Sequence, residues 1–259
     1  MRIAVELAVR PEFAVHLVSC RDDHHDWSAP EPRSGYGLVL VRRGRFRRKV
    51  AGLTADVDPT LGYLSLPGDE ERFAHPAGGD VCTSISLSPG IWHSMVHNRP
   101  ASSLYVDARL DLAHRRLLAA ATNGDVDYAL AERLLALVAA TLDRPESTRA
   151  DRTLVARARA AIHADHPASR GLLPLAEMLA VSPYRLSRAF PQQLGVSLTR
   201  YRNRVRVGRA LDRLEGGEAD LAGLAADLGF ADQAHLTRTV REHCGHTPAA
   251  LRRLLSACR

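Results

Sequence analysis

Two segments near the carboxy-terminal end of the chain share one plan. The first is LLPLAEMLAVSPYRLSRAF at residues 172–190, and the second is LAGLAADLGFADQAHLTRTVREHCGHTP at residues 221–248. In each, apolar residues recur at steps of three and four, which is the period of an amphipathic helix. Turn residues interrupt each segment once, so each predicts two helices joined by a sharp turn. The two segments therefore predict tandem helix-turn-helix units, a pattern that indicates double-stranded DNA as the partner.

The turn residues predict where the helices begin and end. Ser182 followed by Pro183 starts a helix, because the serine oxygen caps an amide and proline needs no donor in the first turn. Gly229 takes positive φ without steric cost, and Asp232 caps a helix that runs to about residue 243. Pro191 removes one helical hydrogen bond, so we expect it to end the second helix of the first unit early.

Residues 152–259 resemble the DNA-binding domain of the AraC/XylS family of bacterial transcription regulators, which has two helix-turn-helix units on a shared linker helix. The most specific part is GFADQAHLTR at 229–238, followed by GHTPAALR at 245–252. Two positions depart from the family. Leu251 stands where an aromatic residue is usual, and Leu198 where proline is frequent. The resemblance implies an all-α DNA-binding domain.

Sequence-specific contacts require side chains on the exposed face of each unit's second helix, because only major-groove base edges distinguish all four base pairs. Helical spacing and the resemblance give these candidates: Tyr184, Arg185, Ser187 and Arg188 in the first unit, and Gln233, Ala234, His235, Thr237 and Arg238 in the second. Arginine can pair with guanine and glutamine with adenine. Contact with phosphate instead of a base stays open for each polar candidate, and His235 could simply be exposed. The intervening apolar residues are expected in the core: Leu186, Phe190, Leu236 and Val240.

Positive charge is confined to one part of the chain. Residues 151–259 contain 17 arginines, no lysine and 10 acidic residues, a net charge of +7, whereas residues 1–150 carry a net charge of −1. Affinity for DNA should therefore fall with salt, because phosphate neutralisation releases counterions. The expected linker helix carries five arginines that either face phosphate or form a solvated surface: Arg202, Arg204, Arg206, Arg209 and Arg213.

Residues 1 to about 106 contain short runs bounded by Gly, Pro and Asp, which are typical of strands. Eight are predicted, at residues 3–9, 14–19, 36–42, 45–50, 53–57, 62–66, 82–87 and 104–106. They suggest a small β-barrel or jelly roll. Gly44 after a strand and LSLPGDE at 64–70 resemble the cupin-like amino-terminal domain of AraC/XylS regulators. Two amphipathic helices follow, at about 110–121 and 126–142. Their apolar stripe either packs on its own domain or, as the resemblance implies, mediates dimerisation.

The predicted fold class is α+β. A cupin-like sensor or dimerisation domain occupies residues 1–143, with strands to about 106 and the helix pair at about 110–142. A polar linker follows at 144–151, and the AraC-type DNA-binding domain occupies 152–259. The chain has no long apolar run and no secretory signal, so we expect a cytoplasmic location.

One group in the amino-terminal domain has the composition of a metal site. Four scattered cysteines argue against a disulfide framework. Cys20, His24, His75 and Cys82 could bind zinc or another borderline-soft metal if their segments are adjacent. The alternative is ordinary half-buried cysteines and surface histidines. A second group, Trp92, His93 and His97, is expected to be structural and not helical, because Pro89-Gly90 and Pro100 flank it. The acidic residues at 69–71 could contact a cationic effector but are expected to be solvated.

Three functions follow from these patterns. The leading one is a transcription regulator, not an enzyme, in which the amino-terminal domain binds a small-molecule or metal effector or forms a homodimer. RNA polymerase is a further partner if the protein is an activator. A cupin-type metalloenzyme fused to a DNA-binding domain would need a histidine triad, which the strands do not offer. An Ada-like DNA-repair regulator would need four cysteines, and only two precede residue 244. No cofactor is certain, and zinc is the candidate. The effector, the operator, the direction of regulation and the oligomeric state stay open.

Overall fold

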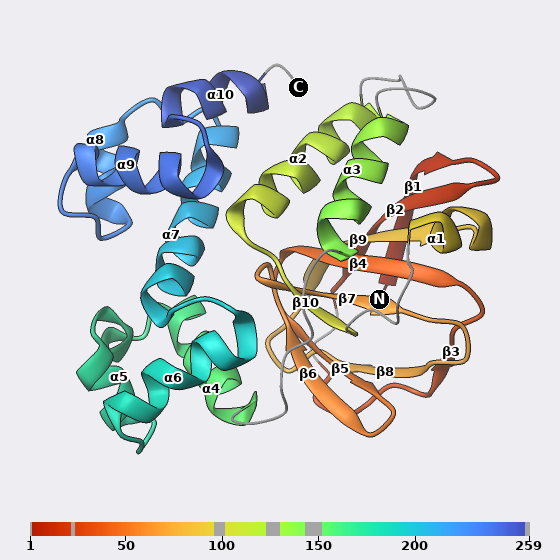
Figure 1. Cartoon of the computed structure of the whole chain (residues 1–259), viewed down its shortest axis with the longest axis horizontal. Helices are drawn as coiled ribbons and strands as arrows, with labels where there is room; N and C mark the ends of the chain where they lie inside the picture. The colour runs from red at the N-terminus through yellow and green to blue at the C-terminus, as the bar shows by residue number, and fades with distance from the viewer. Residues whose placement is uncertain (1, 22–23, 96–101, 123–129, 143–151, 257–259) are drawn as a thin grey trace. The chain divides into compact units, whose positions relative to one another are not determined.

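The computed structural model describes residues 2–21, 24–95, 102–122, 130–142 and 152–256 (Figure 1). The chain divides into two compact units, Met1–Pro145 and Glu146–Ala257. The first unit contains the strands and a helix pair, and the second is helical, which confirms the predicted α+β class. The expected linker at 144–151 lies outside the described residues.

The strands of the amino-terminal unit form two antiparallel sheets. The six-stranded sheet has the order β1 (Arg2–Val9), β2 (Phe13–Cys20), β9 (Asp80–Leu87), β4 (Tyr36–Arg43), β7 (Leu61–Ser65) and β10 (Ser103–Tyr105). The four-stranded sheet has the order β3 (Glu31–Pro32), β8 (Glu70–Ala74), β5 (Phe46–Val50) and β6 (Leu53–Val57). All eight predicted strands are present. The sequence prediction missed β3 and β8, because β3 is only two residues long and β8 begins with two glutamates, which resemble a turn.

Two apolar cores lie on opposite faces of the six-stranded sheet. Alternation along β9 separates them. Ile85 and Leu87 belong to the core shared with the helices, whereas Cys82 packs with Phe46 and Phe73 of the four-stranded sheet. The two sheets therefore enclose one core between them, as in a jelly roll, and the helix pair covers the second core.

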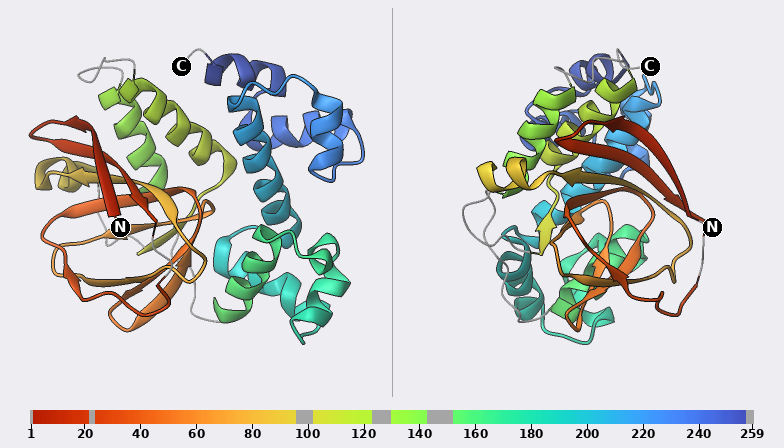
Figure 2. Two further views of the ribbon diagram at one scale, coloured as in Figure 1. Left: turned by 180° about the vertical axis from the view of Figure 1, so that it is seen from behind. Right: turned by 90° about the vertical axis from the view of Figure 1, so that its right-hand side faces the viewer.

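Helices α2 (Ala108–Thr122) and α3 (Ala131–Leu142) lie side by side against the six-stranded sheet (Figures 1 and 2). Their predicted apolar stripe is buried within the same unit: Leu117, Leu130, Leu134, Leu137 and Val138. Packing on its own domain, one of the two predicted roles, therefore accounts for this stripe. The dimer role stays a prediction, and among the described residues of α3 only Leu135 is a large exposed apolar side chain.

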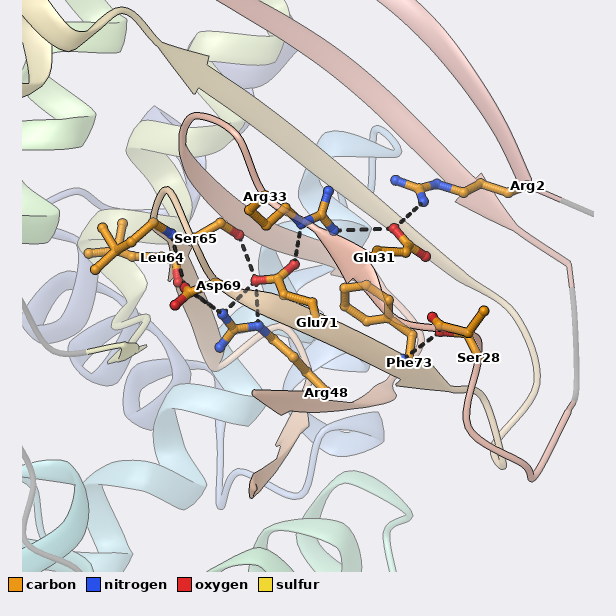
Figure 3. A network of polar contacts seen from close by, with 12 residues as sticks. Arg2, Ser28, Glu31, Arg33, Arg48, Leu64, Ser65, Asp69, Glu71 and Phe73 are labelled. Carbon is orange, nitrogen blue, oxygen red and sulfur yellow. Dashed lines mark hydrogen bonds and ion pairs between the residues drawn. The ribbon is translucent and has the colours of Figure 1, made fainter. Parts of the chain in front are cut away.

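A network of charged side chains is buried in the four-stranded sheet (Figure 3). Glu71 has no exposed surface, and Arg48 is 2% exposed. One oxygen of Glu71, Oε1, accepts hydrogen bonds from Arg48 Nε at 2.9 Å and Ser65 Oγ at 2.8 Å. The other, Oε2, accepts from Arg33 Nε at 2.6 Å. The expectation that residue 71 is solvated was wrong, since the alternation of β8 turns its side chain inward, where two arginines neutralise it.

A short helix, α1 (Pro89–Met95), replaces the irregular segment expected around Trp92. The prediction was wrong because Pro89 occupies the first turn, where a missing amide donor costs no hydrogen bond. Trp92 is buried and stacks on Tyr36 at a centroid distance of 4.6 Å, which agrees with the structural role predicted for it. His93 is exposed, and its Nε2 lies 3.1 Å from the Tyr36 hydroxyl. His97 lies outside the described residues.

The second unit consists of short helices around one long helix. In chain order they are α4 (Arg152–His163), the 3-10 turn Pro167–Arg170, α5 (Leu172–Met178), α6 (Pro183–Leu194), α7 (Leu198–Glu215), α8 (Leu221–Asp227), α9 (Gln233–Cys244) and α10 (Pro248–Ser256). Helix α5 packs on α6, and α8 packs on α9. Helix α7 joins these two pairs, as expected for a linker helix. No described helix is both long enough and apolar enough to cross a membrane.

Helix α6 does not end at Pro191, which corrects the sequence prediction. The helix continues to Leu194, where Gly195 closes it at φ 69°. Proline at 191 removes the amide that would bond to the carbonyl of Ser187. Because Pro191 is exposed, water can satisfy that carbonyl, and the helix tolerates the lost hydrogen bond.

Candidate DNA-recognition surface

The first helix-turn-helix unit presents polar side chains on one face of α6. Ser182 caps the helix, since its Oγ accepts a hydrogen bond from Arg185 N at 3.2 Å. Leu186 and Phe190 are fully buried, as predicted. The candidates Tyr184, Arg185 and Arg188 are exposed, and Ser187 is half-buried with its hydroxyl donated to the Tyr184 carbonyl at 3.2 Å. The Arg188 guanidinium lies 5.8 Å from the Tyr184 ring centre, so these two side chains share one surface.

The second helix-turn-helix unit repeats this arrangement on α9. Asp232 Oδ1 accepts from His235 N at 2.6 Å and caps the helix, while Leu236 and Val240 are buried. Gln233, Ala234 and Arg238 are exposed, and His235 and Thr237 are half-buried. We call the exposed side chains of α6 and α9 the recognition surface. The sequence prediction omitted Arg241, which is exposed three residues beyond Arg238 on α9 and could have been found from that spacing.

His235 has a structural contact as well as partial exposure. Its ring meets Phe230 edge-on at a centroid distance of 5.3 Å, and its Nδ1 accepts from Ala231 N at 3.4 Å. The ring therefore helps to hold the turn before α9. Nε2 is the nitrogen that remains to meet a partner.

The tight turns of the two helix-turn-helix units carry different residues at the position of positive φ. Gly229 has φ 71°, which confirms its predicted role, whereas Ala180 occupies the corresponding place in the first unit at φ 55°. Each residue follows the carboxy-terminal cap of the first helix of its unit, Leu228 or Leu179. A Cβ in this left-handed region clashes with the following carbonyl, so the first turn carries strain that the second lacks.

Replacing Ala180 with glycine should therefore stabilise the carboxy-terminal unit, Glu146–Ala257, by about 0.5–1 kcal/mol, because the relieved strain exceeds the entropy that glycine adds to the unfolded chain. The matched change Gly229→Ala should destabilise it by about 1 kcal/mol. Urea denaturation followed by helical circular dichroism measures both. Destabilisation by Ala180→Gly would show that the turn is not strained.

The five candidate arginines of α7 do not form one phosphate-facing set. This result corrects the prediction that all of them could face DNA phosphate. Arg204 is 1% exposed. Arg209 pairs with Asp165 at 2.7 Å, and Arg213 pairs with Glu218 at 2.6 Å and Asp227 at 3.2 Å. These partners come from other parts of the unit, so sequence spacing along α7 could not reveal them.

Arg202 and Arg206 remain as candidates for phosphate contact from α7. They are half-buried and lie one helical turn apart on the same face. Burial lowers the pKa of both guanidinium groups, and for Arg206 the charge of Arg202 adds to this effect. The Arg206 guanidinium also lies 5.4 Å from the Phe230 ring centre, which connects α7 to the turn before α9.

The predicted metal-ligating residues lie together at one end of the amino-terminal unit, with one addition. Ligand atoms of Cys20, His75 and Asp80 lie within 4.8 Å of one another. His24 Nε2 lies 3.1 Å from His75 Nδ1, and the Cys82 thiol donates to Asp80 Oδ2 at 2.8 Å. Burial raises the pKa of both thiols. Asp80 was missed because only the pairing of β2 with β9 places it opposite Cys20.

Known proteins resemble the second unit most clearly. Residues 175–254 match the family described as helix-turn-helix domain. The chain is 32% identical over 78 residues to the arabinose operon regulatory protein of Salmonella typhimurium, and 33% identical over 78 residues to the transcriptional activator RhaS of Escherichia coli. Each match covers 30% of this chain and 28% of the relative, so the chain aligns with under a third of the length of either relative.

A likeness to a solved structure extends over more of the chain. The crystal structure of ToxT from Vibrio cholerae covers 95% of this chain and 99% of its own, with 11% identity and a TM-score of 0.39. At this identity and TM-score, no function or ligand can be carried from that structure to this chain.

The second unit is a double helix-turn-helix domain, defined by two capped helix pairs on a shared long helix. More narrowly, residues 175–254 are similar to the helix-turn-helix domains of AraC-type regulators, represented by the arabinose operon regulatory protein and RhaS.

Proposed function

We propose that this protein is a DNA-binding transcription regulator in which residues 152–259 read DNA and residues 1–143 control that binding. The observation that carries the proposal is the two-faced character of α6 and α9. Each helix buries an apolar face and exposes arginine beside other polar groups on the opposite face. The net charge of +7 over residues 151–259 supports the same partner.

The proposed readers are nine residues, of which six are exposed members of the recognition surface and three are half-buried neighbours. They are Tyr184, Arg185, Ser187 and Arg188 on α6, and Gln233, Ala234, His235, Thr237 and Arg238 on α9. Arg188, Arg238 and Gln233 have the geometry for paired hydrogen bonds to base edges. Tyr184, 71% exposed, is suited to a thymine methyl group or a sugar.

Selection of bound sequences from random duplexes tests the proposal. Arg238→Ala should weaken binding to the selected site by about 1–3 kcal/mol and relax the preference at one base pair. Arg238→Lys is the matched control, because lysine keeps the charge but not the paired hydrogen bonds. If Arg238 contacts guanine, both variants lose specificity. If it contacts only phosphate, lysine keeps the wild-type preference.

Failure to enrich any sequence, together with unchanged binding by Arg188→Ala and Arg238→Ala, would overturn the regulator proposal. Binding that is insensitive to salt would also contradict it, because phosphate contacts release counterions.

The amino-terminal unit is proposed to act as the switch. An effector, a metal ion or a second copy of the chain would have to favour one of two states of the protein to change DNA affinity. As a regulator of transcription, the protein would act in the cytoplasm and would not itself be an enzyme. Comparing DNA affinity of the full chain with and without a candidate effector measures this coupling.

A further inference from the structure

One group of metal-ligating side chains lies where β2 ends and β9 begins. Cys20 pairs directly with Asp80 across these antiparallel strands, so both side chains lie on the same face of the sheet. His75 approaches from the other sheet, since it directly follows β8. A thiol, an imidazole and a carboxylate from three separate segments therefore converge within 4.8 Å.

Hydrogen bonds fix which nitrogen of His75 faces the group. His24 Nδ1 donates to the Asp26 carbonyl at 2.8 Å, so Nε2 of a neutral His24 carries no proton. His75 Nδ1 lies 3.1 Å from that Nε2 and must donate to it. Nε2 of a neutral His75 then carries a lone pair and lies 3.0 Å from Asp80 Oδ1.

Asp80 has a buried oxygen that this arrangement leaves unsatisfied. Its side chain is 3% exposed, and Oδ2 accepts from the Cys82 thiol. Oδ1 has no hydrogen-bond partner among the described residues, although His75 Nε2 is within 3.0 Å, because that contact lacks hydrogen-bond geometry. Asp80 Oδ1 and the Nε2 of a neutral His75 are thus two buried acceptors 3.0 Å apart that do not satisfy each other, and a cation bound to both would satisfy them.

We propose that Cys20, His75 and Asp80 bind a divalent transition-metal ion of the zinc type. Sulfur, nitrogen and oxygen are its usual protein ligands, and three protein ligands leave a fourth position for water or an external ligand. Zinc bonds of about 2.0–2.3 Å in a tetrahedral site place two ligand atoms roughly 3.3–3.8 Å apart. Ligand atoms that are now up to 4.8 Å apart would therefore need to approach one another by about 1 Å to close on the ion.

This ligand set differs from the one predicted from the sequence, because Asp80 takes the place of His24 and Cys82. His24 orients His75 by accepting a hydrogen bond from His75 Nδ1, and the Cys82 thiol donates a hydrogen bond to Asp80 Oδ2. Residues around a metal site commonly orient its ligands in this way. The backbone is closely packed here as well. A Cβ on Gly79 would lie 2.3 Å from the Cys20 carbonyl oxygen, so glycine allows β2 and β9 to meet at this point.

Cobalt(II) titration of the chelator-treated full chain tests the site without DNA. A Cys244→Ser, Cys258→Ser background removes the two cysteines outside the amino-terminal strands. We expect one equivalent of cobalt to bind, with a sulfur-to-cobalt charge-transfer band, and zinc to displace it. Cys20→Ser should abolish the band, whereas the matched variant Cys82→Ser should keep it.

Two further variants test the roles of the neighbouring residues. Asp80→Asn, which preserves shape, should weaken cobalt binding at least tenfold, and His24→Ala should weaken it about 10- to 100-fold. Fluorescence of Trp92, which is buried in the same unit, shows whether each variant is folded. Absence of stoichiometric cobalt binding by the background protein, or a band that survives in folded Cys20→Ser, would overturn the proposal.

Discussion

Replacing Glu71 with alanine is expected to lower the free energy of unfolding of the amino-terminal unit by about 3–5 kcal/mol, because it leaves a buried charge without its partner. Arg48 is 2% exposed, and its guanidinium lies 4.2 Å from the centre of the Tyr63 ring. Only Glu71 approaches both Arg48 and Arg33 within hydrogen-bond distance in this network (Figure 3). Removing it therefore leaves Arg48 with only the half-exposed Asp69, at 3.8 Å, and Arg33 with only the half-exposed Glu31, at 3.4 Å, as acidic partners in this network.

Glu70→Ala is the matched control for this change. Glu70 precedes Glu71 on the same strand, but its side chain is exposed, so its loss should change stability by no more than about 0.5 kcal/mol. Denaturant unfolding followed by tryptophan fluorescence measures both variants. The two tryptophans of the chain, Trp27 and Trp92, both belong to the amino-terminal unit, so the signal excludes the helix-turn-helix domain. Equal stability of the two variants would contradict the network's importance.

Acid is expected to destabilise the same unit through His114. This histidine is 1% exposed, and its Nε2 lies 2.7 Å from Thr83 Oγ1. Burial, and then the charge of Arg42, lower the pKa of His114 to about 3. In the unfolded chain its pKa is about 6.5. Below pH 6.5 the unfolded state binds a proton that the folded state does not, so stability is lost as the pH falls from 6.5 towards 3.

The contribution of His114 should reach about 2 kcal/mol at pH 5, as the difference between the two pKa values requires. His114→Gln removes the titrating group, so its stability should fall less than that of the wild type between neutral pH and pH 5. Thr83→Val is the control, because it loses the hydrogen bond at every pH but keeps the buried histidine. Tryptophan fluorescence again reports the unfolding. Identical pH dependence in wild type and His114→Gln would exclude this mechanism.

The sequence predicted the helical domain well because the signals that define it are local. Ser182 and Asp232 cap the helices that follow them within three residues. Gly229 requires only its own φ angle. The faces of α6 and α9 follow from helical period, which placed Leu186 and Leu236 in the core and the candidate readers outside it.

The prediction failed where a residue's state depends on its surroundings in the folded unit. Pro191 was expected to end a helix, but the exposure of that position lets the helix continue. Arg204 belongs to an arginine series that appears solvated in sequence, yet the fold buries it. Glu71 was expected to be solvated, and its two arginine partners lie 23 and 38 residues away.

The sequence by itself thus determined the tandem helix-turn-helix units, their caps and turns, the confinement of positive charge, and the class of fold. Helical period, capping and charge act over a few residues and can be read in order along the chain. Only the tertiary structure decided that Asp80 meets Cys20 and His75, because that meeting depends on the register of β2 with β9 and on the path of the chain from β8. No hairpin turn joins β2 to β9, since six strands lie between them in the chain, so their register depends on which faces pack into the cores of the sandwich.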